Sequence, residues 1–152
     1  MDEFKIFCAG RFVTGRQTLE VINPYDQKAF ARSWLADDSL FEEAAEAALG
    51  AVPRLAGMPL WQRSRILEDL GRTLLEQQDE FTRIIAREAG KPWRYALAEL
   101  KRAAQTFLVA AEEARRPPME YMRLDWTPEA TGREAMVKYF PVGAVAGISP
   151  FN

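Results

Sequence analysis

The chain has 152 residues, and 48% of them are apolar, which is enough for about one domain with a hydrophobic core. Its 20 Lys and Arg residues are balanced by 22 Asp and Glu residues, so no net basic charge is available to attract nucleic acid. Histidine is absent and Cys8 is the single cysteine, which excludes a histidine base, a Ser-His-Asp triad and a multi-cysteine zinc site within this chain. The N-terminus is acidic and lacks a long apolar stretch, so we expect no signal peptide and no membrane span. A single cysteine suits a reducing, cytoplasmic location.

Strands are predicted in the N-terminal part of the chain. Residues 5–10 and 11–15 flank a glycine-containing turn, residues 19–26 end in an Asn-Pro turn, and residues 28–36 form a further strand. Cys8 lies in the first of these apolar segments. We therefore expect Cys8 to be a small, half-buried strand residue rather than a reactive thiol.

Helices are predicted to follow from Asp37. Ser39 and Glu42 have the spacing of a capping box at the start of the first helix, and Pro53 is expected to break it. A second helix is predicted over residues 60–77, with its apolar side formed by Ile66, Leu67, Leu70 and Leu74.

Two further helices are expected before the next prolines. Asp79 suits the cap of a short third helix, and Gly90 suits the left-handed position at its end. A long fourth helix is predicted over residues 93–116. Its apolar residues are spaced three and four apart: Leu97, Leu100, Ala104, Phe107, Ala111 and Ala114.

The next segments alternate between apolar and polar residues. Residues 120–126 place Met122, Leu124 and Trp126 on one face, and residues 133–140 resume as a second extended segment. This pattern predicts a β-hairpin arm whose apolar face needs a sheet or a partner subunit to cover it.

The sequence ends with FPVGAVAGISPFN, residues 140–152. The nearly continuous apolar run from Val142 to Ile148 is typical of a strand buried on both faces of a parallel sheet. Such a strand needs neighbours, and the crossover to a parallel neighbour takes about a dozen residues.

Several segments together resemble the N-terminal third of the aldehyde dehydrogenase superfamily. They are INPYD (22–26), REAGKP (87–92), AELKRAAQTF with AAEEARR (98–116) and FPVGAVAGISPFN (140–152), all in register. Within the superfamily, the sequence of these segments is most similar to the branch that includes lactaldehyde, non-phosphorylating glyceraldehyde-3-phosphate and phosphonate-linked aldehyde dehydrogenases.

The resemblance implies an α/β fold, namely the N-terminal part of a Rossmann-like cofactor-binding domain with an incomplete sheet. Residues 1–118 would be its N-terminal strands and helical layer, and residues 119–140 a β-hairpin oligomerisation arm. Residues 141–152 would be the first strand of the cofactor-binding sheet, truncated at its end. Because the arm in this family reaches a neighbouring subunit, a homodimer or homotetramer is implied.

The resemblance further implies oxidation of an aldehyde to a carboxylic acid with NAD or NADP, through a cysteine thiohemiacetal and a thioester. Asn152 matches the asparagine whose amide stabilises the oxyanion. The residues that match the segment against the nicotinamide side of the cofactor are Ile148, Ser149, Pro150 and Phe151.

The other catalytic groups of the family lie downstream of Asn152, so the isolated chain is predicted to be inactive. Cys8 does not replace the nucleophile, since the nucleophile belongs to a different domain. Glu88, Lys91 and Lys138 are assigned no catalytic role and are expected to be solvent-exposed charges.

Arg102 is the residue that bears on the substrate. On the fourth helix it lies with Tyr95 and Gln105, away from the apolar stripe, on the face that borders the substrate tunnel in resembling enzymes. An arginine there suits a carboxylate or phosphate, because its planar fork pairs bidentately. The alternative is a solvated surface arginine, paired with Glu99 or Gln105.

Two other interpretations of the whole chain stay open. The chain could be a non-catalytic binding or assembly module that uses the hairpin and the last strand as interaction surfaces. No charged residue or proline within residues 142–148 protects that strand's edge, which disfavours a module of this kind. The chain could also come from an acylating, coenzyme A-dependent aldehyde dehydrogenase, whose distinguishing residues lie downstream.

Overall fold

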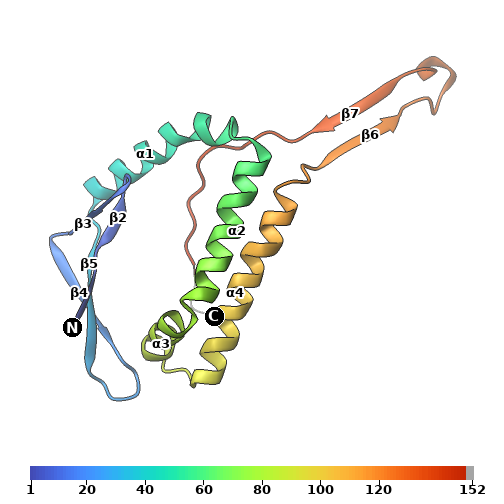
Figure 1. Cartoon of the computed structure of the whole chain (residues 1–152). Helices are drawn as coiled ribbons and strands as arrows, with labels where there is room; N and C mark the ends of the chain where they lie inside the picture. Colours follow the sequence, from blue (N-terminus) through green and yellow to red (C-terminus); the bar gives the residue numbers. More distant parts are fainter. Residues whose placement is uncertain (150–152) are drawn as a thin grey trace.

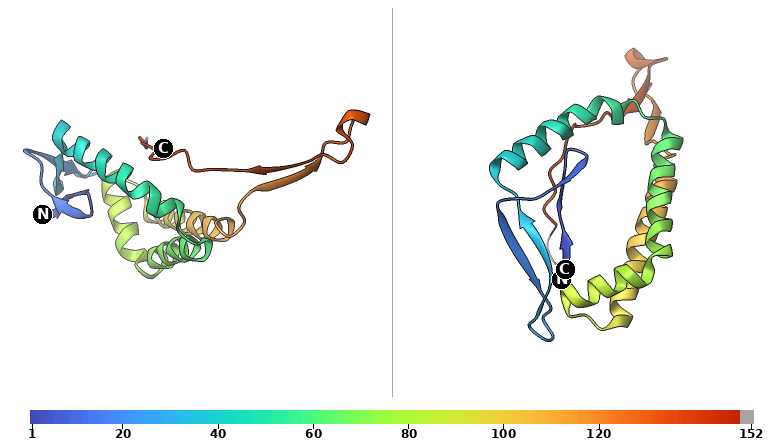
Figure 2. Two further views of the ribbon diagram at one scale, coloured as in Figure 1. Left: turned by 90° about the horizontal axis from the view of Figure 1, so that it is seen from above. Right: turned by 60° about the vertical axis from the view of Figure 1, so that its left-hand side comes forward.

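The structure is a computed structural model that describes residues 1–149. Small sheets near the N-terminus face a layer of helices, and α1 connects the two parts (Figure 1). Viewed from the side, these parts form an open ring, from which a long hairpin protrudes (Figure 2). The expected α/β fold with a helical layer, a hairpin arm and incomplete sheets is confirmed. No helix within the described range is long and apolar enough to cross a membrane.

The N-terminal strands form two small sheets. One has the order β1-β5-β4, where β5 (Ala29–Leu35) pairs in parallel with β1 (Asp2–Phe4) and antiparallel with β4 (Gln17–Ile22). The other is the predicted hairpin of β2 (Ile6–Cys8) and β3 (Arg11–Val13). These pairings confirm the strands expected from the alternating and turn-bounded segments of the sequence.

The first helix, α1 (Asp38–Ala56), begins two residues earlier than the Ser39 capping box predicted. Asp37 is the N-cap, because its carboxylate accepts a 3.0 Å hydrogen bond from the Leu40 backbone N–H. The Ser39 hydroxyl donates to the same carboxylate at 2.7 Å, so it supports the cap rather than forming it. The predicted Ser39–Glu42 capping box is therefore wrong.

Pro53 does not break α1, as the sequence had suggested it would. The helix continues to Ala56, and the Gly57 N–H donates to the Pro53 carbonyl at 3.1 Å. A proline inside a helix removes one N–H donor. Since Pro53 lies close to the end of α1, the hydrogen bond that it cannot donate affects only the end of the helix.

The helical layer consists of α2 (Leu60–Glu76), α3 (Gln78–Ala89) and α4 (Trp93–Glu113), close to the predicted positions. Asp79 lies inside α3 instead of capping it, and α4 ends before Arg116. The side chains that α4 buries are Ala96, Leu100, Ala104 and Ala111. The predicted stripe is thus confirmed at Leu100, Ala104 and Ala111.

The contact between α2 and α4 depends on small residues of α2. Ser64 and Gly71 are buried, whereas Ile66 and Leu70 of the predicted apolar side are 50% and 46% exposed. The Ser64 hydroxyl donates to the Ala111 carbonyl at 2.7 Å and accepts from the Arg115 Nε at 2.8 Å. Small residues let the two backbones approach closely, and Ile66 and Leu70 lie outside this contact.

Helix α3 holds the helical layer against the main sheet. The Arg87 guanidinium lies 4.4 Å from the centre of the Phe30 ring in β5, and it also reaches Asp2 of β1 at 3.9 Å. Gly90 ends α3 with φ +62, as its left-handed position predicted. A Cβ atom at Gly90 would lie 3.4 Å from Pro24, so two of the segments that carry the family resemblance are in contact.

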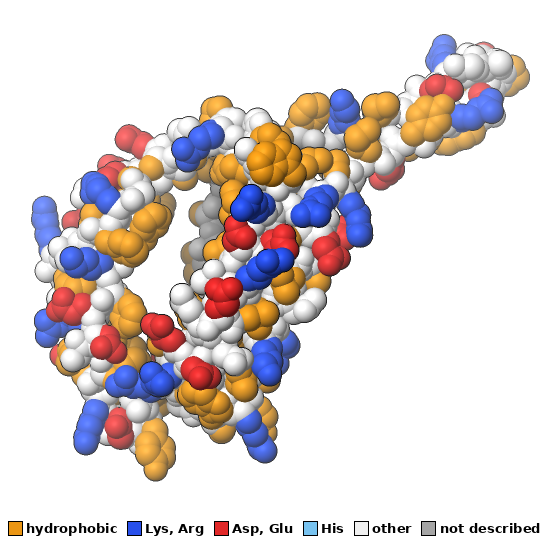
Figure 3. Space-filling model, viewed as in Figure 1, with side chains coloured by type: hydrophobic (Ala, Val, Ile, Leu, Met, Phe, Trp, Pro, Cys, Tyr) orange, Lys and Arg blue, Asp and Glu red, His pale blue; other side chains and the backbone are white. Residues whose placement is uncertain are grey.

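The hairpin arm is formed by β6 (Met119–Arg123) and β7 (Glu134–Lys138), which pair antiparallel with Tyr121 opposite Met136. A short 3-10 turn, Pro128–Ala130, lies near its tip. Large apolar side chains of the arm are exposed: Met119, Tyr121, Trp126 and Met136. Figure 3 shows hydrophobic side chains along the arm. Met119, Tyr121 and Met136 lie on the strand face opposite Met122, which is half-buried, so the exposed apolar side chains of the strands are not on the face that the sequence predicted.

The strand predicted from Val142 is not formed in this chain. Residues 139–149 have no regular secondary structure, and every residue of 141–149 is exposed. A parallel strand is stabilised by hydrogen bonds to its neighbours, and the described residues supply no neighbouring strand for this segment. Instead, the segment returns from the arm past the junction of α1 and α2 (Figure 1). There, Pro141 and Gly143 line a pocket with Val52, Leu55, Ala56 and Arg63.

Candidate functional site

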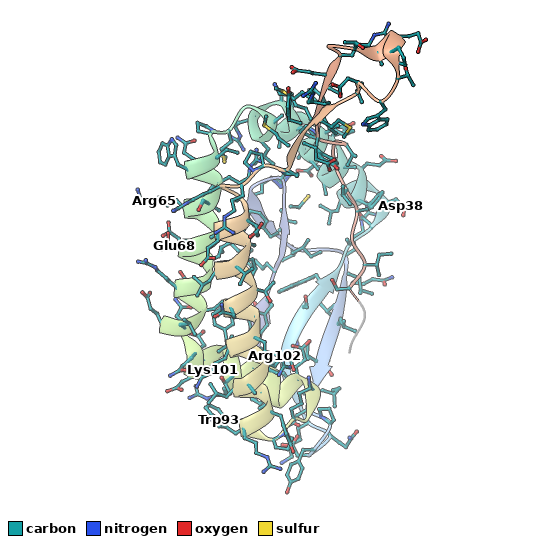
Figure 4. All side chains as sticks on the ribbon, turned by 90° about the vertical axis from the view of Figure 1, so that its right-hand side faces the viewer. Asp38, Arg65, Glu68, Trp93, Lys101 and Arg102 are labelled. Atoms are coloured by element: carbon teal, nitrogen blue, oxygen red, sulfur yellow. The ribbon has the colours of Figure 1, made fainter. Side chains whose placement is uncertain are left out.

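Arg102 lies on the exposed face of α4, away from the residues that pack on α2 and α3. Tyr95 and Val109, which share this face on the helical wheel, are 54% and 46% exposed. The Arg102 backbone carbonyl accepts a 2.9 Å hydrogen bond from the Thr106 hydroxyl, which belongs to the helix itself. Figure 4 labels Arg102 on α4 beside Lys101. The second, mixed face that the sequence predicted for this helix is therefore present.

The Arg102 guanidinium makes no hydrogen bond or ion pair with another residue of the described chain. The pairing with Glu99 or Gln105, expected for a surface arginine, is not formed. Glu99 instead binds Lys91, the residue between the end of α3 and the start of α4. The guanidinium thus remains available to a ligand or to solvent.

Lys91 differs from its sequence-based prediction. It was expected to be a solvent-exposed charge, but its side chain is only 25% exposed and is paired with the half-buried Glu99. The two residues are eight positions apart, and Lys91 lies in the turn before the helix that carries Glu99, so helical spacing alone gives no signal of the pair. Glu88 and Lys138 are exposed, as predicted.

The residues predicted to contact a cofactor lie in the C-terminal segment. Ile148 and Ser149 are exposed, and Ile148 is 97% exposed. Pro150, Phe151 and Asn152 lie outside the described residues. The backbone groups of residues 141–149 make no hydrogen bond within the part of the chain that the structure describes, so they remain available to another strand or to a ligand.

Cys8 has no features of a reactive site. It is 3% exposed, and its thiol donates to the Leu40 carbonyl of α1 at 3.5 Å. The thiol thus connects β2 to α1, which confirms a structural role and shows deeper burial than expected. Among residues 1–149, no group of three or more cysteine or acidic side chains could hold a metal ion.

Comparison with known proteins gives a consistent result. A model of the aldehyde dehydrogenase family matches residues 12–152. The 3-sulfolactaldehyde dehydrogenase of Priestia aryabhattai is 32% identical over 152 residues, which cover 100% of this chain and 31% of that protein. The lactaldehyde dehydrogenase of Methanocaldococcus jannaschii is 29% identical over 147 residues, or 97% of this chain and 30% of that protein.

A solved structure supports the same assignment. Aldehyde dehydrogenase 21 from Physcomitrella patens, in complex with the reaction product succinate, superimposes with a TM-score of 0.85. It is 33% identical, and the match covers 90% of this chain and 29% of that chain.

The fold is α/β, and the relatives named above are aldehyde dehydrogenases. The chain belongs to the aldehyde dehydrogenase family. It spans about 31% of the length of the curated relatives that it matches first. The resemblance predicted from the sequence, including its link to lactaldehyde dehydrogenases, is confirmed.

Proposed function

We propose that this chain acts as the N-terminal part of an NAD(P)-dependent aldehyde dehydrogenase that oxidises an aldehyde to a carboxylic acid. The observation that carries the proposal is the family match, which runs through residues 12–152. When bound, NAD or NADP supplies the hydride acceptor that this oxidation requires. The nucleophilic cysteine and the general base would come from other parts of the enzyme.

The contribution of this chain to the site would be positioning and charge stabilisation. Ile148, Ser149, Pro150 and Phe151 would lie against the cofactor, and the exposed backbone of residues 141–149 suits such contacts. Asn152 would donate its side-chain N–H to the oxyanion that forms when a nucleophile attacks the carbonyl. A neutral donor fixed in place before the reaction stabilises the transition state without a cost of reorganisation.

The first test removes the side-chain amide of Asn152 in an enzyme that contains this chain. Losing one oxyanion donor costs about 3 kcal/mol of barrier, so Asn152→Ala should lower kcat about 100-fold with a smaller change in KM. Reduction of NAD or NADP, followed by absorbance, measures both constants. Gln62→Ala, which removes an exposed amide from α2, is the control and should leave kcat unchanged. An unaltered kcat for Asn152→Ala would show that this residue is not an oxyanion donor.

For the substrate, we propose an aldehyde that carries a second, anionic group bound by Arg102. Two of the similar proteins support this choice. One is named for 3-sulfolactaldehyde, which carries a sulfonate, and the other holds succinate, which carries two carboxylates. An exposed guanidinium without a protein partner matches such a group, since its planar fork pairs bidentately with an oxyanion.

The second test compares 3-sulfolactaldehyde with lactaldehyde, which lacks the sulfonate. Charge-assisted hydrogen bonds contribute roughly 1.5–3 kcal/mol, so Arg102→Leu should raise KM for 3-sulfolactaldehyde about 10- to 100-fold. KM for lactaldehyde should rise much less. Equal increases for the two aldehydes would contradict an anion-binding role for Arg102.

The proposal also has consequences for assembly and location. The exposed apolar side chains of β6 and β7 suit contact with a second copy of the enzyme, so we propose a homodimer or homotetramer. A cytoplasmic location agrees with the single cysteine, which cannot form a disulfide within the chain. Sedimentation equilibrium of the enzyme and cell fractionation would test these two statements, and a monomer or a secreted protein would contradict them.

A further inference from the structure

We propose that Lys91 is a positioning residue for substrate selection. By binding Glu99, Lys91 keeps the Glu99 carboxylate away from Arg102, so that the Arg102 guanidinium stays available to the anionic group of a substrate. The inference rests on the proposed function of Arg102 and adds to it a second residue that sets the substrate preference.

The geometry of α4 makes Glu99 the natural competitor of the substrate. Glu99 and Arg102 are three residues apart, a spacing at which oppositely charged side chains on a helix meet. Side chains on a helix lean toward its N-terminus, so Arg102 leans toward Glu99. Without another partner for Glu99, these two residues would be expected to neutralise each other.

The structure shows that Glu99 has such a partner. Its carboxylate binds the Lys91 ammonium, which precedes α4, while Arg102 makes no ion pair within residues 1–149. The lean of the Glu99 side chain toward the N-terminus of α4 brings its carboxylate toward Lys91 and away from Arg102.

Lys91 is well placed to keep this contact. Its backbone lies between Gly90, which ends α3 in a left-handed conformation, and Pro92, which is the N-cap of α4. The side chains of Lys91 and Glu99 are 25% and 35% exposed, so the pair is partly shielded from solvent and salt. Lys101, the nearest lysine on α4 itself, is exposed and forms no ion pair in the described part of the chain.

The expected effect follows from the strength of the competing pair. An exposed ion pair contributes a few tenths of a kcal/mol to about 1 kcal/mol, which corresponds to a change of about two- to five-fold in an equilibrium constant. In an enzyme with Lys91→Met, Glu99 should turn to Arg102. KM for 3-sulfolactaldehyde should then rise about two- to five-fold relative to KM for lactaldehyde.

The experiment uses an enzyme that contains this chain and measures KM and kcat for both aldehydes. In addition to Lys91→Met, it includes the double variant Lys91→Met/Glu99→Gln, in which the competing carboxylate is gone and the preference should return. Lys91→Arg keeps the positive charge and should also keep the preference. Lys101→Met is the matched control and should change the KM ratio of the two aldehydes by less than the Lys91 variant.

The outcomes separate this inference from the proposed function. If Arg102→Leu weakens 3-sulfolactaldehyde selectively but Lys91→Met does not, the role of Lys91 is overturned and the anion site at Arg102 stands. If Lys91→Met shifts the preference but the double variant does not restore it, the competition by Glu99 is overturned. If Arg102→Leu shows no selectivity, the anion site and the role of Lys91 fall together, while turnover of lactaldehyde by the unaltered enzyme still shows dehydrogenase activity.

A further variant keeps the inference testable if Lys91→Met does not fold. Glu99→Gln alone removes the negative charge next to Arg102, so it should lower KM for 3-sulfolactaldehyde relative to lactaldehyde. The absence of a decrease would contradict the inference. A purely structural role of the Lys91–Glu99 pair would change stability but not the ratio of the two KM values.

Discussion

Asp37 illustrates how a single side chain starts a helix. Its carboxylate accepts hydrogen bonds from the Ser39 hydroxyl and the Leu40 N–H, and Arg16 lies 3.7 Å away. These contacts favour the ionised form, so the pKa of Asp37 is lowered, with the Ser39 hydrogen bond as the largest cause. A carboxyl group whose pKa is lower in the folded state stabilises that state above its unfolded pKa. This stabilisation is lost as the pH falls through the folded pKa.

The consequence is that Asp37→Ala should change the thermal stability of the protein by an amount that depends on pH. At neutral pH the variant should have a lower Tm than the unaltered protein, because the N-cap of α1 is lost. The difference should shrink as the pH falls below the ordinary aspartate pKa of 3.8, where the native carboxyl group also becomes protonated. Thermal unfolding followed by circular dichroism at several pH values measures this. Asp38→Ala, which removes a first-turn acid without removing the cap, is the control, and a Tm difference independent of pH would contradict the assignment.

At the scale of elements, the contact between α2 and α4 depends on the absence of a side chain at Gly71. A Cβ atom there would lie 3.0 Å from two carbons of the Leu108 side chain and 3.1 Å from the Ala104 carbonyl oxygen. The backbone oxygen cannot move without shifting α4. A side chain at position 71 would therefore require α4 and the Leu108 side chain to shift by a few tenths of an ångström.

Gly71→Ala should destabilise the protein by about 1–3 kcal/mol, the usual cost of overpacking a well-packed contact. Gly50→Ala in α1 is the matched control, because a Cβ atom at Gly50 meets nothing within 4 Å. That control should be neutral or stabilising by up to about 1 kcal/mol, since alanine favours a helix more than glycine does. Urea denaturation of an enzyme that contains the chain measures both, and equal midpoints for the two variants would refute the close contact.

At the scale of the whole molecule, the sequence predicted the elements well and their environment less well. The strands, the helices and the hairpin follow from local patterns, which the residues carry by themselves. On the apolar side predicted for α2, Leu67 and Leu74 are half-buried and Ile66 and Leu70 are exposed, whereas the fully buried residues of this helix are Ser64 and Gly71. The burial of a side chain depends on which other element of the chain packs against it, and the periodicity of the sequence does not predict that packing.

In the candidate site, too, the sequence predicted the local feature but not the contacts between separate parts of the chain. The exposed face of α4 that carries Arg102 could be read from the helical pattern. The Lys91–Glu99 pair could not, since Lys91 lies in the turn between α3 and α4 and the conformation of that turn sets where its side chain reaches. The strand beginning at Val142 was predicted from the apolar run to Ile148, but a strand forms only with hydrogen-bonding neighbours, which residues 1–149 do not provide.

The different sequence separations of the paired strands affect the order of folding. The hairpins β2–β3, β4–β5 and β6–β7 join segments that are near neighbours along the chain, so their ends meet quickly, on a scale of about 1–10 μs for a typical hairpin. The parallel pair β1–β5 joins Asp2 to Ala31, and the Ser64–Ala111 bond joins residues still farther apart. Closing these longer loops costs more entropy. The arm can thus be complete before the sheet and the helical layer from which it protrudes have formed.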